Sequence, residues 1–511
     1  MKTQFKAAEY IEKLIRYGKS RALLSEIDHP QVRNQLMDLL KIIEPYEGNV
    51  AIDENESLHK ILSYLVDYAV SIGLILDTIT ERDLIDSKIM AQLLPRQSEV
   101  QRTYEDIVVR KGKIQATNYF YRFNQNSNYI RMDRIEKNIH WLTTTDYGDL
   151  EITINLSKPE KDPAEIAAEK DAPVLNYPKC LLCLENVGYS GRLNHPGRSN
   201  HRVLPLTLDR ETWYFQYSPY VYYNEHAIIF SEIHRPMSIS KKTFYRLLDF
   251  VEQVPHYFIG SNAELPIVGG SILSHDHFQG GYHIFPMEKA HVMKTFSNPN
   301  FASTQIKMLK WPLSVIRLAS KDRSELIDLA DQILNEWRLY DDLDVDILSH
   351  TGDVPHNTIT PIARINALGE YEIDLTLRNN RTNDQYPDGI FHPHKYLHHI
   401  KKENIGLIEV MGLAVLPSRL EEEMLQIQNI LSGRINIELA MQEEMLYKHE
   451  DWIRDLVERF GTNQTEMNAL RLLRQEVGEK FTQVLECSGV FKQSNQGFEA
   501  FEKFLHLCTN L

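Results

Sequence analysis

The hydrophobic pattern changes several times along this chain, and the changes limit the folds it can adopt. Apolar residues recur with a helical period from residue 1 to about 95, and again after Pro417 almost to the end. Between these ends, short alternating runs typical of strands occupy about 103–157, parts of 178–300 and parts of 345–416. A chain of 511 residues usually forms two or three packed units. We therefore expect β-rich central units flanked by helical segments.

The charge balance narrows the choice of partners. The chain has 71 acidic and 56 basic side chains, a formal net charge of −15, which argues against nucleic acid or an anionic membrane as partner. No apolar run is long enough to span a membrane, and MKTQFKAAEYIEKLIRYG does not resemble a cleavable signal, so we expect a cytoplasmic protein. Four cysteines are too few for a disulfide framework, which leaves reduced thiols or a metal site.

The stretch SILSHDHFQGGYHIFP, residues 271–286, gathers polar groups on one side of a predicted strand. Because side chains alternate between the faces of a strand, His275, His277 and Gln279 share one face, and Asp276 and Phe278 share the other. A lone histidine is more often a satisfied or exposed side chain than a functional one. Three polar groups at every second position, between GGS and GG, instead favour a functional surface.

These residue types suit covalent phosphoryl or nucleotidyl transfer. A neutral imidazole is a good nucleophile near pH 7 and can attack phosphorus. A glutamine amide can donate a hydrogen bond to a non-bridging phosphate oxygen as the group transfers. Glycines let the backbone approach a ligand closely and present N–H donors to phosphate oxygens.

The segment resembles the active-site strand of the histidine-triad superfamily, in the transferase branch where glutamine replaces the third histidine of His-x-His-x-His. The stretches KCLLCLENVGYSGRLNHPGRSNHRVLPL, FSEIHRPM and GGSILSHDHFQGG resemble the galactose-1-phosphate uridylyltransferase family in its longer, bacterial type 2 form. The resemblance runs from about residue 100 to 430, and the terminal helical segments fit the extra length of the type 2 form.

The resemblance implies an α+β fold made of two histidine-triad-like half domains with antiparallel sheets, plus helical segments at both ends. The expected divisions are a helical segment 1–95, an N-terminal domain 96–300 carrying the HxHxQ strand, a C-terminal domain 301–420 and a helical segment 421–511. It also implies a homodimer whose active sites are composite.

The resemblance further implies transfer of UMP from UDP-glucose to galactose 1-phosphate, as in galactose catabolism. His277 would be the nucleophile that becomes uridylylated, and Gln279 would hold the phosphoryl oxygens. His275 and nearby carbonyls would set which imidazole nitrogen of His277 is free. The loop that touches the diphosphate would contain Gly269, Gly270 and Ser271.

Cys180 and Cys183 form a single CxxC pair, which by itself is consistent with a redox pair, two ordinary buried thiols or a metal site. The resemblance implies that the pair binds zinc or iron with His234 and His275, because some members of the family carry such a site. Its role would be structural, fixing the position of the reacting strand. Two cysteines retained without a metal remain the alternative.

The loop GYSGRLNHPGRSNHR, residues 188–202, concentrates positive charge in an acidic protein. A charge run is usually a solvated surface, but a UDP-sugar and a sugar phosphate bring negative charges that arginine forks can meet. We expect Arg198 or Arg202 to contact phosphate and Asn194 or Asn200 to contact ribose or uracil, with Arg192 as a further substrate-binding candidate.

The second half of the chain carries FHPHKYLHH and LPSRL. His392 and His394 repeat the spacing of a metal pair, but the stretch resembles a structural histidine region of the family's second domain. The LPSRL segment resembles one that reaches the nucleotide in the other active site of a dimer, which makes Arg419 a candidate phosphate contact.

Two other functions remain open. A dinucleoside polyphosphate phosphorylase or an adenylyltransferase could use the same HxHxQ strand, and a preference for adenine over uracil would reveal it. A non-catalytic, zinc-binding scaffold would keep the CxxC pair but has no use for HxHxQ between glycines.

Overall fold

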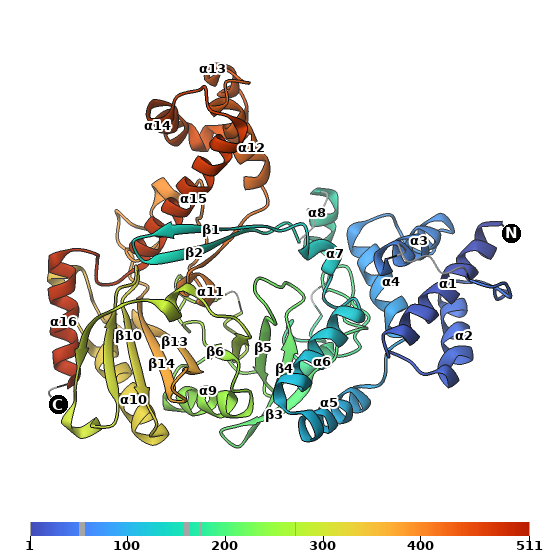
Figure 1. The fold of residues 1–511 in the computed structure, drawn as a ribbon, viewed down its shortest axis with the longest axis horizontal. Coiled ribbons are helices and arrows are strands. Elements are labelled where there is room, and N and C mark those ends of the chain that lie inside the picture. Colours follow the sequence, from blue (N-terminus) through green and yellow to red (C-terminus); the bar gives the residue numbers. More distant parts are fainter. Residues whose placement is uncertain (1, 51–56, 158–162, 174, 271, 510–511) are drawn as a thin grey trace.

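A run of helices forms the N-terminal part of the protein in the computed structural model, which describes residues 2–50, 57–157, 163–173, 175–270 and 272–509. The helices lie at one end of the molecule (Figure 1). They are α1 (Lys2–Ser20), α2 (His29–Leu39), α3 (Leu58–Ser71), α4 (Ile79–Ala91), α5 (Gln97–Lys111), α6 (Lys113–Asn126) and α7 (Met132–Ile135).

The strand predicted at TNYFYRF is wrong, because this stretch lies inside α6. Ala116, Phe120 and Phe123 are buried at helical spacing on one side of α6, where they pack into the core. Aromatic residues are common in strands, and several of them in a short run gave the misleading pattern.

A ten-stranded sheet forms the centre of the molecule, and each of its described pairings is antiparallel. The spatial order is β3-β4-β5-β7-β6-β13-β14-β10-β9-β8. The first five are β3 (Leu204–Leu208), β4 (Glu211–Tyr217), β5 (Ala227–Ser231), β7 (His277–Gly281) and β6 (Phe258–Gly260); the others are β13 (Asn357–Ile365), β14 (Tyr371–Asn379), β10 (Val315–Ser320), β9 (Gln305–Leu309) and β8 (Val292–Phe296).

The predicted α+β class is therefore confirmed, and the two halves share one continuous sheet. They join where Ile259 and Gly260 of β6 pair with Ala363 and Ile362 of β13. The expected boundary at residue 300 assigns β8 to the first half, whereas its pairing with β9 places it in the second.

Two helices cover one face of this sheet, α9 (Lys241–Gln253) and α10 (Arg323–Leu339) (Figure 1). The apolar stripe of α9 is buried, and the helix begins after the N-cap residue Ser240. β9 and β10 precede α10 in the chain.

A smaller sheet lies over the opposite face, formed by β1 (Ile139–Thr145), β2 (Gly148–Ile154) and β15 (Leu413–Leu416). β2 and β15 run parallel. Within the strand-like pattern of 345–416, the stretch before β15 forms instead the short helix α11 (Leu407–Val410). A hairpin of β11 (His350–Thr351) and β12 (Val354–Pro355) and the short helix α8 (Pro163–Asp171) complete these connections.

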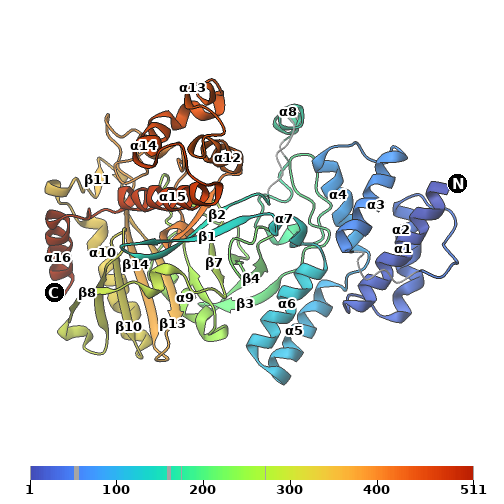
Figure 2. The same cartoon turned by 45° about the horizontal axis from the view of Figure 1, so that its top comes forward.

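The C-terminal helices confirm the helical pattern read after Pro417. They are α12 (Leu420–Leu431), α13 (Ile437–Ala440), α14 (Glu450–Phe460), α15 (Glu466–Ser488) and α16 (Asn495–Thr509). α12 to α15 form a lobe above the small sheet, and α16 lies beside the β8 edge of the large sheet (Figures 1 and 2). The Trp141 indole N–H on β1 donates a 3.1 Å hydrogen bond to the Arg474 carbonyl, which fastens this lobe to the sheet.

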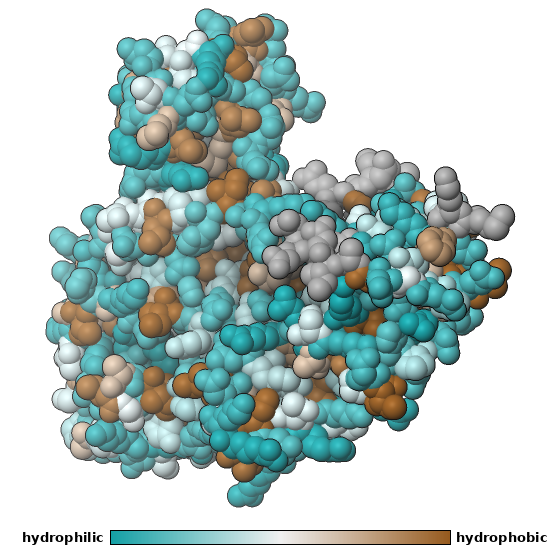
Figure 3. Space-filling model, turned by 45° about the vertical axis from the view of Figure 1, so that its right-hand side comes forward, coloured by the Kyte–Doolittle hydropathy of each residue, from teal (hydrophilic) through white to brown (hydrophobic). Residues whose placement is uncertain are grey.

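The surface seen in Figure 3 is mostly hydrophilic, with hydrophobic residues scattered over it. Among the described helices, none is both long and apolar enough to pass through a bilayer.

Removing the Asp276 carboxylate is expected to destabilise the fold behind β7. Asp276 is buried, and its Oδ2 lies 3.2 Å from Arg235 and 3.5 Å from Arg246. An alanine would leave the buried Arg246 with less negative charge beside it. We therefore expect Asp276→Ala to lower the free energy of unfolding by about 3 kcal/mol. The value is modest because the other partner, Arg235, is partly exposed. Urea unfolding measures the change. Glu232→Ala, which removes an exposed carboxylate just after β5, serves as control, and an equal effect there would contradict the assignment.

Candidate active site and metal centre

The face alternation predicted for the HxHxQ segment is confirmed on β7. Phe278 points into the core and stacks on Trp213, with ring centroids 4.9 Å apart. Asp276 forms its ion pairs on the same side. His277 and Gln279 face the other way and line a cavity.

This cavity, which we call the catalytic cavity, has a volume of about 860 Å³. It lies between the central sheet and the layer that contains α11 and β15, so residues from both halves of the chain meet there. Its walls include Arg198, Gln216, Tyr222, His226, Ile228, Asn262, Gly269, Gly270, His277, Gln279, Lys401, Glu403, Asn404, Leu407 and Glu409.

His277 is held in one tautomer by the backbone. Its Nδ1 lies 2.7 Å from the carbonyl oxygen of His275; a carbonyl can only accept, so Nδ1 carries the proton. No hydrogen bond to Nε2 occurs within the described part of the chain, which leaves that nitrogen with its lone pair available. Burial lowers the pKa of His277 to about 4, so the ring is neutral at pH 7.

Gln279 lies two residues further along β7, opposite Ile228 of β5. Its side-chain oxygen is buried and has no hydrogen-bond partner among the described residues. A buried amide group without a partner is costly, and a ligand in the cavity would satisfy it.

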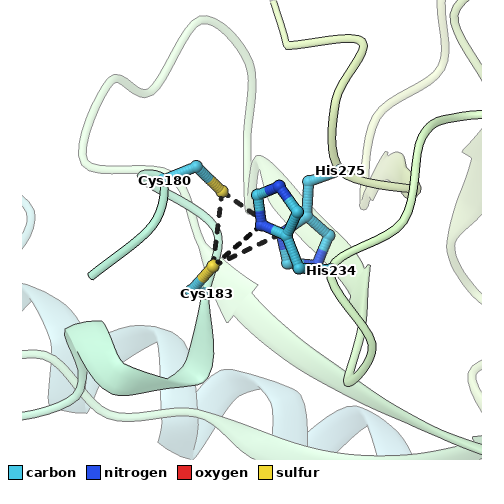
Figure 4. Close-up of side chains that lie close together, drawn as sticks. All are labelled: Cys180, Cys183, His234 and His275. Carbon is cyan, nitrogen blue, oxygen red and sulfur yellow. Dashed lines mark hydrogen bonds between the residues drawn. The ribbon is translucent and has the colours of Figure 1, made fainter. Parts of the chain in front are cut away.

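The four predicted metal ligands converge, as Figure 4 shows. One ligand atom from each of Cys180, Cys183, His234 and His275 lies within 4.8 Å of the others. The Sγ atoms of the two cysteines are 3.6 Å apart. His275 Nδ1 lies 3.2 Å from Cys180 Sγ, and His234 Nδ1 lies 3.2 Å from Cys183 Sγ. Tetrahedral zinc with ordinary bond lengths has S···S and S···N edges of about 3.8 and 3.5 Å, so the donor set fits such an ion.

A backbone hydrogen bond orients His275 as a metal ligand. Its Nε2 lies 2.8 Å from the Ser231 carbonyl oxygen, so Nε2 donates and the Nδ1 lone pair faces the cysteines. Metal-bound histidines usually carry such a hydrogen bond on the second ring nitrogen. The cluster is therefore a candidate metal centre at the start of the reacting strand.

Among the predicted arginines, the structure places only Arg198 in the catalytic cavity. Its guanidinium lies over the Tyr129 ring, 5.3 Å from the centroid, and donates a 2.9 Å hydrogen bond to the Tyr129 hydroxyl. Arg202 is buried away from the cavity, where its donors meet the carbonyls of Pro95, Ser199 and His201. Arg192 likewise binds loop partners, including the Tyr177 carbonyl. Both serve to hold their loop.

Asn200 also differs from its expected position. Its amide donates to the Ser127 carbonyl at 2.9 Å, and the residue lines a neighbouring cavity of about 330 Å³ that shares Arg198 and Tyr220 with the catalytic cavity. Asn194 lines the same neighbouring cavity.

The predicted glycine loop does reach the catalytic cavity through Gly269 and Gly270; Ser271 falls outside the described residues. Glycine is required at 270, because a Cβ there would lie 2.7 Å from the Asn262 amide nitrogen. Arg419 is not in the cavity wall: it donates to the His399 carbonyl at 3.0 Å and to Glu423 Oε2 at 2.6 Å.

Sequence reasoning missed several polar residues of the cavity, including Lys401 and Asn262. Lys401 is buried, and its ammonium group lies 3.0 Å from Glu409 Oε1 and 3.2 Å from the Val415 carbonyl. Asn262 connects the halves by accepting a 2.9 Å hydrogen bond from the Leu407 amide. Lys401 lies in KKENIGLIEV, whose only visible signal was the strand pattern, and Asn262 had no signal of its own.

Comparisons with known proteins agree with this architecture. The chain matches the family described as galactose-1-phosphate uridyl transferase, N-terminal domain, over residues 23–236 and its C-terminal domain over residues 250–455. A galactose-1-phosphate uridylyltransferase of Caldanaerobacter subterraneus subsp. tengcongensis is 57% identical over 98% of both chains. The protein of that name in Bacillus subtilis is 48% identical over 97% of both.

The chain is an enzyme of the nucleotidyltransferase class. It belongs to the galactose-1-phosphate uridylyltransferase family. Among solved structures, yeast Ap4A phosphorylase aligns with a TM-score of 0.33 and 12% identity over 67% of this chain and 93% of its own, a likeness too weak to bear on function.

Proposed function

We propose that this enzyme transfers UMP from UDP-glucose to galactose 1-phosphate through a uridylyl-histidine intermediate on His277. The observation that carries the proposal is the fixed tautomer of His277. Its Nδ1–H donates to the His275 carbonyl oxygen, so Nε2 is unprotonated, and the ring lines the catalytic cavity. Relatives that bear the galactose-1-phosphate uridylyltransferase name over nearly their whole length support the choice of substrates.

The first half-reaction forms one bond and breaks one. Nε2 of His277 attacks the α-phosphorus of UDP-glucose, and the bond from that phosphorus to the bridging oxygen breaks, so glucose 1-phosphate leaves with the electron pair. The proton stays on Nδ1, which donates to the His275 carbonyl oxygen, and this hydrogen bond stabilises the positive charge that develops on the ring. In the second half-reaction a phosphate oxygen of galactose 1-phosphate attacks the same phosphorus, the P–N bond breaks and neutral His277 is restored.

The surrounding residues supply the complementary charge. Gln279 can turn its amide to donate to a non-bridging oxygen, and the N–H groups of the loop with Gly269 and Gly270 can meet the diphosphate. Arg198 and Lys401 offer positive charge from opposite halves of the chain. Arg192, Arg202 and Asn200 hold the loop that presents Arg198 rather than contacting substrate.

The metal centre would have a structural role. Zinc or iron held by Cys180, Cys183, His234 and His275 would fix the start of β7 and would supply no reacting group. We further propose a homodimer and a reducing compartment such as the cytoplasm, which suits free thiols.

The proposal is tested by intact-protein mass spectrometry after incubation with UDP-glucose and no acceptor. We expect a mass gain of one uridylyl group that disappears when galactose 1-phosphate is added. An adduct that forms from an adenine dinucleotide but not from UDP-glucose would replace the donor with an adenine nucleotide. No adduct from either would overturn the two-step mechanism.

The rate of uridylylation is expected to stay constant as the pH falls from 8 to 5. The reason is that His277 acts in its neutral form and burial lowers its pKa to about 4. Protonation would therefore remove activity only as the pH falls through about 4, and not near the ordinary value of about 6.5. Single-turnover rates at saturating UDP-glucose measure this dependence. A loss centred near pH 6.5 would contradict the neutral, buried state of His277.

A further inference from the structure

A second cavity, of about 1240 Å³, lies between the 385–402 loop and the C-terminal helices α14 and α15. Its wall contains part of FHPHKYLHH, which the catalytic cavity does not use. Four lysines line it, Lys395, Lys402, Lys448 and Lys480, together with three aspartates, Asp388, Asp451 and Asp455, and the rings of Tyr386, Tyr396 and Trp452.

A buried relay of side chains ends at this cavity. Glu423 is 2% exposed and its Oε2 lies 2.9 Å from His449 Nε2, so that nitrogen donates to the carboxylate. His449 Nδ1 lies 2.8 Å from His399 Nδ1. Since burial lowers the pKa of both histidines, both rings are neutral, and His449 Nδ1 must accept from His399 Nδ1–H.

The relay leaves the other nitrogen of His399 as an acceptor. His399 is only 8% exposed, it lines the second cavity, and no hydrogen bond to its Nε2 occurs among the described residues. Arg419, the arginine expected at a phosphate, instead fixes this position by donating to the His399 carbonyl and to Glu423. Lys448 is paired with Glu423 from the side of the cavity.

The side chains that line the second cavity are complementary to a ligand that carries both hydroxyl groups and a phosphate. An acceptor nitrogen on His399 and the aspartate carboxylates need hydrogen-bond donors, which a phosphate dianion lacks and a sugar has. Lys395, Lys402 and Lys480 form no ion pair within the described part of the chain, so they can meet an anion, and an ammonium group is a common phosphate partner. Aromatic rings offer flat apolar faces on which the C–H face of a sugar ring can pack.

We propose that the second cavity is a non-catalytic binding site for a hexose phosphate. The phosphate lies by Lys480 and Lys402, a sugar hydroxyl donates to His399 Nε2, and the sugar ring packs on Trp452 or Tyr396. This site lies outside the catalytic cavity, so its existence does not depend on the proposed reaction.

The test uses the full-length His277→Ala variant, which cannot be uridylylated at that residue, and glucose 6-phosphate as the probe. Isothermal titration calorimetry is expected to show one molecule bound per chain, with affinity unchanged by saturating UDP-glucose. Lys480→Ala is expected to weaken binding about tenfold, as for loss of one charged hydrogen bond. His399→Phe, which removes the acceptor, is expected to do the same.

Two controls keep the result specific. Lys310→Ala removes an exposed lysine outside every cavity described above and should leave the affinity unchanged. Inorganic phosphate and free glucose should each bind more weakly than glucose 6-phosphate. Absence of binding at millimolar probe, equal binding of phosphate alone, or equal loss in Lys310→Ala would each overturn the proposal. None of these outcomes depends on uridylyl transfer, so a failure here leaves the proposed reaction standing.

Discussion

Replacing His277 with alanine is expected to abolish the uridylyl adduct and to lower kcat for the exchange by about 10⁴-fold or more, the scale seen when a catalytic nucleophile is removed. The methyl group cannot form a bond to phosphorus. Of the other histidines in the described cavity wall, His226 has the same tautomer, because its Nδ1 lies 2.8 Å from the Tyr220 carbonyl oxygen. His226 also lines the cavity and is neutral, but its Nε2 is buried and out of reach of solvent. The adduct is measured by intact mass and kcat by release of glucose 1-phosphate.

His283→Ala is the matched control for this prediction. His283 comes from the same segment but is paired with Glu151, at 2.9 Å, and does not line the catalytic cavity. We expect it to keep the adduct and to change kcat by less than about tenfold. An adduct that persists in His277→Ala, or that disappears in His283→Ala alone, would mean that another histidine is the nucleophile.

The period-two pattern of HDHFQ predicted the two faces of β7 correctly because both faces have strict requirements. Phe278 and Asp276 must pack on Trp213 and the arginines behind the sheet, which fixes His277 and Gln279 on the cavity side. A one-residue shift would bury the polar groups, so the register follows from local sequence alone. The CxxC pair and its two histidines were likewise placed correctly by the resemblance of short motifs.

Which charged side chains line the catalytic cavity depends on contacts that are distant in sequence. Arg202 has the charge that a phosphate contact needs, but its guanidinium donates instead to the carbonyl oxygen of Pro95, which is distant in sequence. Lys401 reaches the cavity because β6 pairs with β13 and brings the second half of the chain beside β7. Neither the hydrogen bond to Pro95 nor the pairing of β6 with β13 can be read from the local sequence pattern, because both join residues that are far apart in the chain.

His275 connects the candidate metal centre to His277, the proposed nucleophile, through three different atoms. Its Nδ1 faces Cys180, its Nε2 donates to the Ser231 carbonyl, and its own carbonyl oxygen holds the proton of His277. The position of that carbonyl determines which nitrogen of His277 can react. A change in the cluster is therefore passed directly to the tautomer and orientation of the nucleophile, although no cluster residue needs to touch substrate.

From this link we expect the double variant Cys180→Ser, Cys183→Ser to lose its metal and to lower kcat by about 10- to 100-fold, the usual scale when support for a reacting group is removed. Elemental analysis should find about one zinc or iron per chain in the unaltered protein and almost none in the variant, with a lower unfolding temperature because metal binding stabilises the folded state. Cys487→Ser, outside the cluster, should retain both metal and activity. A metal-free protein with full activity would show that two thiols and two histidines hold His277 in place by packing alone.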